Sequence, residues 1–592
     1  MMKQSITTSY NNENIEKYSK TAALSAVTCD LCSTLVTSLQ DLSESGKNAD
    51  EIIKFAIDFC TLFHIEKKNV CEGIIPLFRN ETFEIVANKT YSPVYICGFV
   101  GICPFNPANY SGTIVFPTPK PPHVPPVPPA KGGPTKTILH LSDFHIDQFY
   151  QEGMNADCGQ PVCCRAADGP GSGSNAAGAW GDYRCDVNLP MVHSMLSNIA
   201  SQVTPDYIFW TGDNPPHDVW MQTHETQLNA SALITDLLDK YFPGVQVYPA
   251  IGNHEGVPVN SFPLPDTGGA NWLYSQLEKD WSNWLLSSGV DTSTISLGGY
   301  YSAEMMPGTR LVSLNMNWCN NQNLWMIQNI TDPAGMLEWL IETMESIEAA
   351  KERAYIIGHI PTGISDCIDI WAQQLYQIVD RYEDSIIALF FGHTHHDQFQ
   401  VYHDKTDGHP MAVSYIAPSV TTYTNQNPSY RIYTIDQDSG YILESSTYHG
   451  DVADANTKGF PTWKLTYNAT TAYNMTNMFA ADWQSVLDNM NTNTQVFNQY
   501  YNFFYAQSPY ASSNPCTSKS CIDYYTCEAA SGYYAQYKQC VANKSNGDLE
   551  QLTKTQNFVK SLPKALSSFT TLTKNFNQHS TYKHIRKNNK LY

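Results

Sequence analysis

The 592-residue sequence predicts a multidomain protein with an all-α N-terminal module, an α/β sandwich core and a mostly helical C-terminal region. Three observations predict this class. Clustered cysteines near the N-terminus stand among apolar residues at helical spacing. A proline-rich stretch follows, and beyond it short apolar runs alternate with longer amphipathic ones, as in α/β proteins.

The N-terminal module spans residues 21–104, after a polar segment 1–20 that we expect to be disordered. Its cysteines follow the pattern Cys29-x2-Cys32, Cys60-x10-Cys71 and Cys97-x5-Cys103. The module resembles a saposin domain, a small helical module that binds lipid. That resemblance implies the bridges Cys29–Cys103, Cys32–Cys97 and Cys60–Cys71. The alternative is a disulfide-stapled helical cap with no lipid role.

Residues 105–136 contain nine prolines between Pro117 and Pro134. Such density excludes helix interiors and predicts a semi-rigid extended spacer. A PxxP ligand for signalling domains is the alternative interpretation.

The α/β core is predicted over residues 137–450. Its apolar runs include 137–141, 207–210, 245–251, 311–314, 354–357 and 386–391, and further strands are expected at 411–417 and 431–435. A helical region with four cysteines follows at 451–573. The basic tail, 574–592, is expected to be solvated, although contact with anionic lipid is the alternative.

Polar clusters stand at the ends of five apolar runs, and they predict a metal centre. They read Asp143-Phe144-His145, Gly212-Asp213-Asn214, Gly252-Asn253-His254-Glu255, Gly358-His359 and Gly392-His393-Thr394-His395. Any one of them is compatible with an ordinary turn. Together they are a site signal, because loops at the carboxyl ends of strands are where α/β proteins assemble their sites. Imidazole ligands favour zinc or iron over magnesium or calcium.

The motifs over residues 137–397 resemble those of the calcineurin-like metallophosphoesterase superfamily. The resemblance implies that Asp143, His145, Asp213 and His395 hold one metal ion, and that Asp213, Asn253, His359 and His393 hold the other. In purple acid phosphatases a tyrosine that binds ferric iron stands three residues after the bridging aspartate. Pro216 occupies that position here. We therefore expect two divalent ions, with zinc as the metal.

The order of helical module, spacer, phosphoesterase core and cysteine-bearing helical region resembles the acid sphingomyelinase family. The resemblance implies hydrolysis of sphingomyelin, or a related phospholipid, to ceramide and phosphocholine. It also implies that His254 is the general acid and that His217 stabilises the transition state, while a supporting role is the alternative for His217. His224, His396 and Glu255 are expected at the surface or behind the ligands. The remaining cysteines would pair as Cys158–Cys163, Cys164–Cys185, Cys319–Cys367, Cys516–Cys521 and Cys527–Cys540.

Sixteen cysteines in local clusters predict an oxidising compartment. Glycosylation sequons fit the same interpretation, and they lie at Asn80, Asn88, Asn109, Asn229, Asn329, Asn468, Asn474 and Asn543. We expect a secreted or lysosomal protein, although residues 1–18 lack the apolar stretch of a signal peptide.

The formal charge of -21 excludes a basic nucleic-acid face, so no nucleic-acid partner is expected. The expected partner is a membrane surface, contacted by the N-terminal module of a monomer. Two other functions stay open. One is hydrolysis of nucleotide or other phosphodiesters by the same core. The other is lipid transfer by a protein with a decayed site, although every expected ligand is present.

Overall fold

The structure is a computed structural model that describes residues 21–105, 114–285, 290 and 292–544. It divides into two compact units, one ending at Asn106 and the other running from Pro107 to Asn546. Segment 1–20 and the tail 574–592, predicted to be disordered and solvated, lie outside the described residues, as does sequon Asn109.

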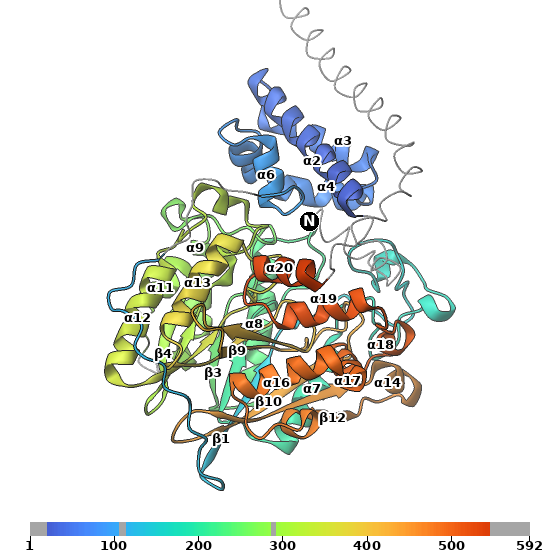
Figure 1. Cartoon of the computed structure of the whole chain (residues 1–592). Helices are drawn as coiled ribbons and strands as arrows, with labels where there is room; N and C mark the ends of the chain where they lie inside the picture. The colour runs from blue at the N-terminus through green and yellow to red at the C-terminus, as the bar shows by residue number, and fades with distance from the viewer. Residues whose placement is uncertain (1–20, 106–113, 286–289, 291, 545–592) are drawn as a thin grey trace, which may run out of the picture. The chain divides into compact units, whose positions relative to one another are not determined.

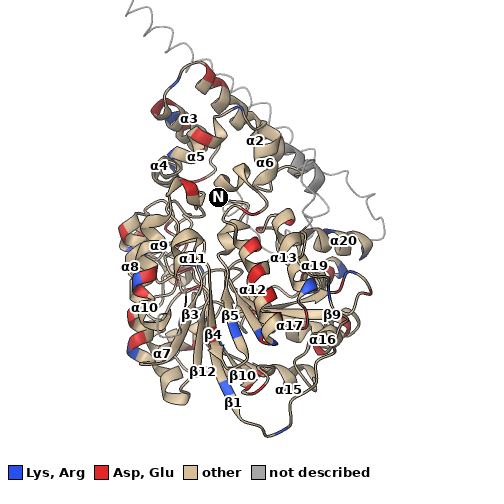
Figure 2. Cartoon of the chain, turned by 90° about the vertical axis from the view of Figure 1, so that its left-hand side faces the viewer, with Lys and Arg blue, Asp and Glu red and all other residues tan. Residues whose placement is uncertain are grey.

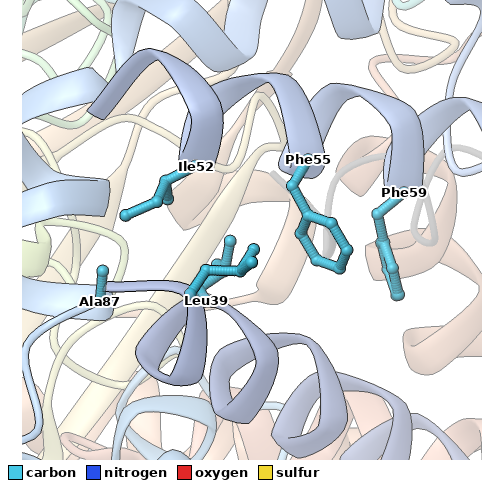
Figure 3. Close-up of a cluster of buried hydrophobic side chains, with 6 residues drawn as sticks. Leu39, Ile52, Phe55, Phe59 and Ala87 are labelled. Carbon is cyan, nitrogen blue, oxygen red and sulfur yellow. The ribbon is translucent and has the colours of Figure 1, made fainter. Parts of the chain in front are cut away.

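The N-terminal unit is helical. Its helices are α2 (Thr21–Glu44), α3 (Ala49–Leu62), α4 (Lys68–Leu77), α5 (Arg79–Glu81) and α6 (Pro93–Phe99). Asn48 and Glu51 start α3 with a capping box, each side chain accepting from the other's backbone N–H. Leu39, Ile52, Phe55 and Phe59 pack into a buried cluster between α2 and α3 (Figure 3). Such a core is small, which is where disulfides stabilise most.

Eight disulfides join the same cysteine pairs that the resemblance implied. Three lie in the helical unit and five in the larger unit; the pairs are Cys29–Cys103, Cys32–Cys97, Cys60–Cys71, Cys158–Cys163, Cys164–Cys185, Cys319–Cys367, Cys516–Cys521 and Cys527–Cys540.

The larger unit is built on two six-stranded mixed sheets, so the predicted α/β sandwich is confirmed (Figure 1). The first sheet has the order β12-β11-β10-β1-β2-β3 and the second β4-β5-β6-β7-β9-β8. The strands are β1 (Thr135–Leu141), β2 (Tyr207–Trp210), β3 (Gln246–Pro249), β4 (Tyr301–Met306), β5 (Thr309–Ser313), β6 (Arg353–Ile357), β7 (Ile386–Phe391), β8 (Gln398–His403), β9 (Pro410–Ile416), β10 (Ser429–Asp436), β11 (Ile442–Gly450) and β12 (Trp463–Asn468).

Parallel pairing places the site-bearing strand ends together. Strands β1, β2 and β3 pair in parallel in one sheet, and β5, β6, β7 and β9 do so in the other. The run Tyr207–Trp210 is apolar throughout because both of its faces are buried. Phe209 packs between the sheets against Tyr355 and Phe390, with ring centroids 6.0 and 5.1 Å away. Trp210 points the other way, toward helix α10.

Helices cover the sandwich. Those inserted between strands are α7 (Leu189–Gln202), α8 (His224–Tyr241), α9 (Asn271–Asp280), α10 (Ser282–Leu285), α11 (Ser293–Gly298), α12 (Met336–Ala350) and α13 (Asp369–Arg381). Those after β11 are α14 (Val452–Lys458), α15 (Ala469–Tyr473), α16 (Ala480–Thr492), α17 (Thr494–Phe504), α18 (Pro509–Ser513), α19 (Lys519–Ala529) and α20 (Tyr534–Lys544).

The C-terminal region is mostly helical, as predicted, but it is joined closely to the core. Helices α16 and α19 pack against β8 and β9, and β12 completes the first sheet. A buried ion pair between Arg431 and Asp397 is shared with this region, because the Tyr467 hydroxyl donates to Asp397 at 2.9 Å. Strand β12 lies inside the region predicted to be helical, although its residues alternate between apolar and polar side chains as a half-buried strand does.

The proline-rich segment also differs from a free spacer. Its described part, from residue 114 to 131, has neither helix nor strand, and it lies along the core. Arg381 donates to the Thr118 carbonyl at 2.9 Å, and the Lys120 ammonium lies 2.5 Å from Asp380 and 2.6 Å from Asp404. We call residues 114–131 the strap. Proline content predicts its backbone but not the polar side chains that anchor it.

Acidic residues lie on helices of both units (Figure 2), as expected of a chain with more Asp and Glu than Lys and Arg residues. Among the helices that the structure describes, none combines the length and the apolar character needed to cross a bilayer.

Candidate metal centre

Loops at the carboxyl ends of β1, β2, β3, β6 and β7 carry all seven predicted ligands. Six of them form two groups, and within each group the ligand atoms lie within 4.8 Å of one another: Asp143, His145 and His395 in one, and Asp213, His359 and His393 in the other. Asn253, the seventh, contacts the second group. The assignment of each residue to a metal ion stays a prediction, and the geometry below bears on it.

The first group surrounds the His145 ring. His145 Nε2 lies 3.2 Å from His395 Nε2 and 3.5 Å from Asp213 Oδ2. His395 Nε2 in turn lies 3.5 Å from Asp143 Oδ1. Asp213 therefore faces this group although its other neighbours belong to the second.

The second group surrounds Asn253. Its Oδ1 lies 3.0 Å from His359 Nε2 and 2.9 Å from His393 Nδ1. His359 Nε2 is also 3.0 Å from Asp213 Oδ2. The same Asp213 oxygen thus faces an imidazole of each group, as the bridging ligand of a two-metal centre would.

Backbone carbonyls determine which ring nitrogen of His145 and of His359 carries hydrogen, and so whether the other nitrogen can bind a cation. The Nδ1 of His145 lies 2.7 Å from the Pro215 carbonyl, and the Nδ1 of His359 lies 2.6 Å from the Thr211 carbonyl. Because a carbonyl only accepts, each Nδ1 carries hydrogen and each Nε2 presents a lone pair. These lone pairs point at Asp213, which also only accepts. A cation between them satisfies every group.

A proton would serve in place of a cation at one ring only. Burial lowers the pKa of His359, but the neighbouring Asp213 and Asp143 outweigh it and raise that pKa to about 9. Burial lowers the pKa of both His145 and His395 well below the ordinary value. Two neutral imidazoles face each other at 3.2 Å there, an arrangement that suits a shared metal ion.

The ligands themselves adopt left-handed backbone conformations. Asp143, His145, Asp213, His393 and His395 have φ between 41° and 70°. Such conformations cost about 1–3 kcal/mol each and persist where the surroundings impose them. Gly212, before Asp213, has a φ of 85°, which favours glycine, whereas Gly252 and Gly392 are required by close approach. A Cβ on Gly252 would lie 2.1 Å from Asp213 Oδ1, and one on Gly392 would lie 1.8 Å from Ser142 Oγ.

Glu255 holds the ligand loops together, as expected of a supporting residue. Its carboxylate accepts from the Gly252 N–H at 2.7 Å, the Asp213 N–H at 3.2 Å and the Asn214 N–H at 2.8 Å. Burial, followed by the charge of Asp213, raises the pKa of Glu255 to about 7.

His254 and His217 lie beside the first group, and His145, His217 and His254 form a third set of converging nitrogens. The His254 N–H donates to Asp213 Oδ1 at 2.8 Å, and the His254 carbonyl accepts from Gln227 at 2.6 Å. Its buried Nδ1 has no hydrogen-bond partner among the described residues. His254 is therefore fixed by its backbone, with a ring nitrogen left to serve a ligand.

Burial lowers the pKa of His254 to about 3, with Asp213 acting in the opposite direction. The ordinary histidine pKa of about 6.5 therefore does not apply to this ring. In the free protein His254 is neutral at mildly acidic pH.

Sequence analysis missed the partner of His217. Both oxygens of the buried Asp186 contact His217: Oδ2 accepts from its backbone N–H at 2.7 Å, and Oδ1 lies 2.8 Å from Nδ1. The contact places the hydrogen on Nδ1 and leaves Nε2 as an acceptor. No motif surrounds Asp186, so the sequence offered no signal for it.

Asp186→Asn is expected to lower kcat/KM by about 10–100-fold, as loss of an orienting carboxylate does. Metal content and melting temperature should stay near those of the unchanged protein, because the isosteric amide keeps one hydrogen bond. Steady-state kinetics and elemental analysis of the same preparation measure both. A loss of bound metal would show instead that Asp186 shapes the metal centre itself.

Two other histidines lie away from the ligands. His224 is exposed and stacks on Trp272 at 4.0 Å, and His396 stacks on Phe504 at 4.2 Å. His393 is supported from behind, since its Nε2 lies 3.2 Å from Asp366 Oδ2. Asp366 is a further residue that sequence motifs did not indicate.

Two family models match the larger unit. Residues 136–397 match the calcineurin-like phosphoesterase family, and residues 409–547 match the acid sphingomyelin phosphodiesterase C-terminal region.

Several curated proteins are similar over most of the chain. Sphingomyelin phosphodiesterase B of Dictyostelium discoideum is 49% identical over 533 residues, covering 88% of this chain and 83% of the relative. Sphingomyelin phosphodiesterase of Homo sapiens is 39% identical over 504 residues, covering 83% and 79%. A cyclic GMP-AMP phosphodiesterase of Bos taurus is 31% identical over 434 residues, covering 70% and 93%.

Proposed function

Because the chain belongs to the acid sphingomyelin phosphodiesterase family, we propose that it hydrolyses sphingomyelin to ceramide and phosphocholine at the metal centre described above. The enzyme is a metal-dependent phosphodiesterase. The observation that carries the proposal is the facing pair His145 and His395, joined through Asp213 to His359 and Asn253. A decayed site would not retain this complete set of ligands, so the lipid-transfer alternative is not supported.

We further propose that the two divalent ions are zinc. Asp143, His145, Asp213 and His395 would hold one ion, and Asp213, Asn253, His359 and His393 the other. A set rich in imidazole with shared carboxylates suits borderline metals. When bound, such a pair activates a water molecule and offsets the negative charge that develops on the phosphoryl oxygens.

The protein's own residues orient the substrate phosphate. His254, anchored through Asp213 and Gln227, and His217, anchored by Asp186, converge on the same side of His145. As a neutral ring, His254 donates a hydrogen bond to a phosphate oxygen. A bound phosphodiester adds negative charge beside it and so raises its pKa, and protonation of the leaving oxygen by His254 depends on that rise.

The remaining assignments are part of the same proposal. The helical unit would contact the membrane, and the enzyme would act as a secreted or lysosomal monomer. Eight disulfides support an oxidising compartment. Five sequon asparagines are exposed, whereas Asn329 and Asn468 are half-buried; the exposed ones are Asn80, Asn88, Asn229, Asn474 and Asn543.

The proposal is tested with purified full-length protein at pH 5 on three substrates: sphingomyelin vesicles, phosphatidylcholine vesicles and a cyclic dinucleotide. Phosphocholine should be released from sphingomyelin fastest. A chelator should abolish release, because both ligand groups lose their ions, and added Zn²⁺ should restore it.

Preferential cleavage of the cyclic dinucleotide would instead favour the nucleotide phosphodiesterase alternative, which the similarity to the bovine cyclic GMP-AMP phosphodiesterase motivates. Hydrolysis that survives chelation would contradict the metal mechanism for either substrate.

A further inference from the structure

A second cluster of potential metal ligands lies outside the metal centre. Its members come from three separate segments of the larger unit: His123 from the strap, Glu383 from the loop after α13, and His409 from the turn between β8 and β9. Their ligand atoms lie within 4.8 Å of one another. None of the three contributes to the two ligand groups of the metal centre.

Glu383 is the centre of the cluster. Its side chain is 3% exposed, its Oε2 lies 3.0 Å from His409 Nε2, and its Oε1 lies 3.2 Å from His123 Nδ1. The two imidazole rings lie side by side, with centroids 4.4 Å apart and planes inclined by 30°. The two rings thus face the two oxygens of one buried carboxylate.

His409 has more acceptors around it than a neutral ring can serve. Its Nδ1 lies 2.6 Å from Asp407 Oδ1 while its Nε2 faces Glu383. A neutral imidazole has one N–H. Whichever nitrogen of His409 carries it, the other nitrogen turns a lone pair toward a carboxylate. His123 Nδ1 is likewise between two carboxylates, Glu383 and Asp384, the second at 2.8 Å.

The surrounding charge is strongly negative. Five carboxylates gather here, those of Asp380, Glu383, Asp384, Asp404 and Asp407. Lys120 from the strap compensates part of this charge, contacting Asp380, Asp404 and Glu383 Oε1, the last at 3.0 Å. Two further cations lie nearby, since Arg353 lines the same cavity and Lys405 interacts with Asp380, so carboxylates still outnumber cations here.

We propose that His123, Glu383 and His409 bind a third divalent cation, of the class that zinc represents. Two imidazoles with one carboxylate are a common zinc set. Metal–ligand bonds of about 2.0–2.1 Å place tetrahedral ligand atoms about 3.3 Å apart. The Nε2 atom of His409 and Oε2 of Glu383 are 3.0 Å apart, and all three ligand atoms lie within 4.8 Å of one another. Because Glu383 has two oxygens, Oε2 can bind the ion while Oε1 keeps Lys120.

The cluster is accessible to an ion. His123, Glu383 and His409 line a cavity of about 400 Å³ together with Asp384 and Asp407. The cavity leaves room for a solvent ligand on the open side. Since His123 belongs to the strap, an ion bound there fastens residues 114–131 to α13 and to the β8–β9 turn.

The test compares bound zinc in the full-length protein, the H123Q/H409Q variant and the matched control H403Q, after dialysis against Zn²⁺ at pH 7.5. His403 lies on β8, bonds Gln484 at 2.7 Å and is outside the cluster. Elemental analysis should find one zinc ion fewer per chain in H123Q/H409Q than in the wild-type protein and in H403Q. The same number of zinc ions per chain in all three proteins would overturn the proposal. It would show that protonation of the imidazoles, and not a metal ion, balances the carboxylates of the cluster.

His123→Gln alone guards against misfolding of the double variant, because this ring is on the strap and partly exposed. The most weakly held zinc should dissociate at least about tenfold more readily, as measured by competition with a fluorescent zinc chelator. Hydrolytic activity should not change, because the metal centre is untouched. An unchanged zinc affinity would overturn the proposal.

Discussion

Asp213→Ala should reduce phosphodiester hydrolysis by more than about 10³-fold, the upper range for loss of a single charge-stabilising group. The reason is geometric. One Asp213 oxygen faces His145 and His359 at 3.5 and 3.0 Å, and the other accepts the His254 N–H. Removing the carboxylate therefore disturbs both ligand groups and releases the loop that positions His254. Kinetics and elemental analysis should show activity and metal falling together.

Asp206→Ala is the matched control. Asp206 directly precedes β2, the strand that leads to Asp213, and pairs with Lys136 at 2.8 Å in a partly exposed ion pair. Such pairs contribute about 0–1 kcal/mol, so activity and metal content should be retained. Full activity in Asp213→Ala, or equal losses in the two variants, would refute the bridging role of Asp213.

His254→Gln should lower kcat/KM by about 10²–10⁴-fold, the range for a group that donates to the reacting phosphate, while both active-site ions stay bound. The ring contributes no atom to either ligand group, and its backbone contacts to Asp213 and Gln227 survive the substitution. Activity on sphingomyelin vesicles and metal content of the same preparation measure the two effects. Loss of metal would show that the ring is a ligand.

The pH dependence of this variant distinguishes two roles for the ring. With its pKa lowered to about 3, His254 is neutral in the free enzyme at pH 5 and at pH 7. If His254 acts only as a hydrogen-bond donor, the substitution should lower kcat/KM by the same factor at pH 5 and at pH 7. If the ring must be protonated before the substrate binds, the loss of kcat/KM should be larger at pH 5 than at pH 7. His193→Gln, on α7 and bonded to the Tyr241 hydroxyl, is the control and should match the unchanged protein at both.

The meeting of the predicted ligands at one place could be predicted because each of them follows a short apolar strand. An apolar run ending in glycine and a polar residue, as at Trp210 to Asp213, predicts both the strand and the side of the sheet where it ends. Five such ends then predict one site. Asp186 and Asp366 could not be found in this way, because each stands alone in a loop and acquires its histidine only through tertiary contact.

Properties set by burial were also beyond the sequence. The pKa of His254 falls because its ring is enclosed, and no neighbour in the chain indicates this. The strap illustrates the same limit. Its prolines predict an extended backbone, but the carboxylates that receive Lys120 and His123 come from residues 380–404, far along the chain. Strand β12 is a different case, because its alternating apolar and polar residues are a strand signal within a region predicted to be helical.

The contact of Asp397 with Arg431 and Tyr467 bears on how the enzyme can be divided. The two family-model matches, 136–397 and 409–547, suggest a cut near residue 400 for producing a minimal catalytic fragment. Such a cut would separate Asp397 from Arg431 and leave one partner of the buried ion pair in each fragment, and loss of one such partner costs about 3–5 kcal/mol. Asp397 stands two residues after ligand His395, so the damage would reach the metal centre. The family models thus divide the sequence in two, whereas the compact unit of the structure includes both parts and extends through helix α20.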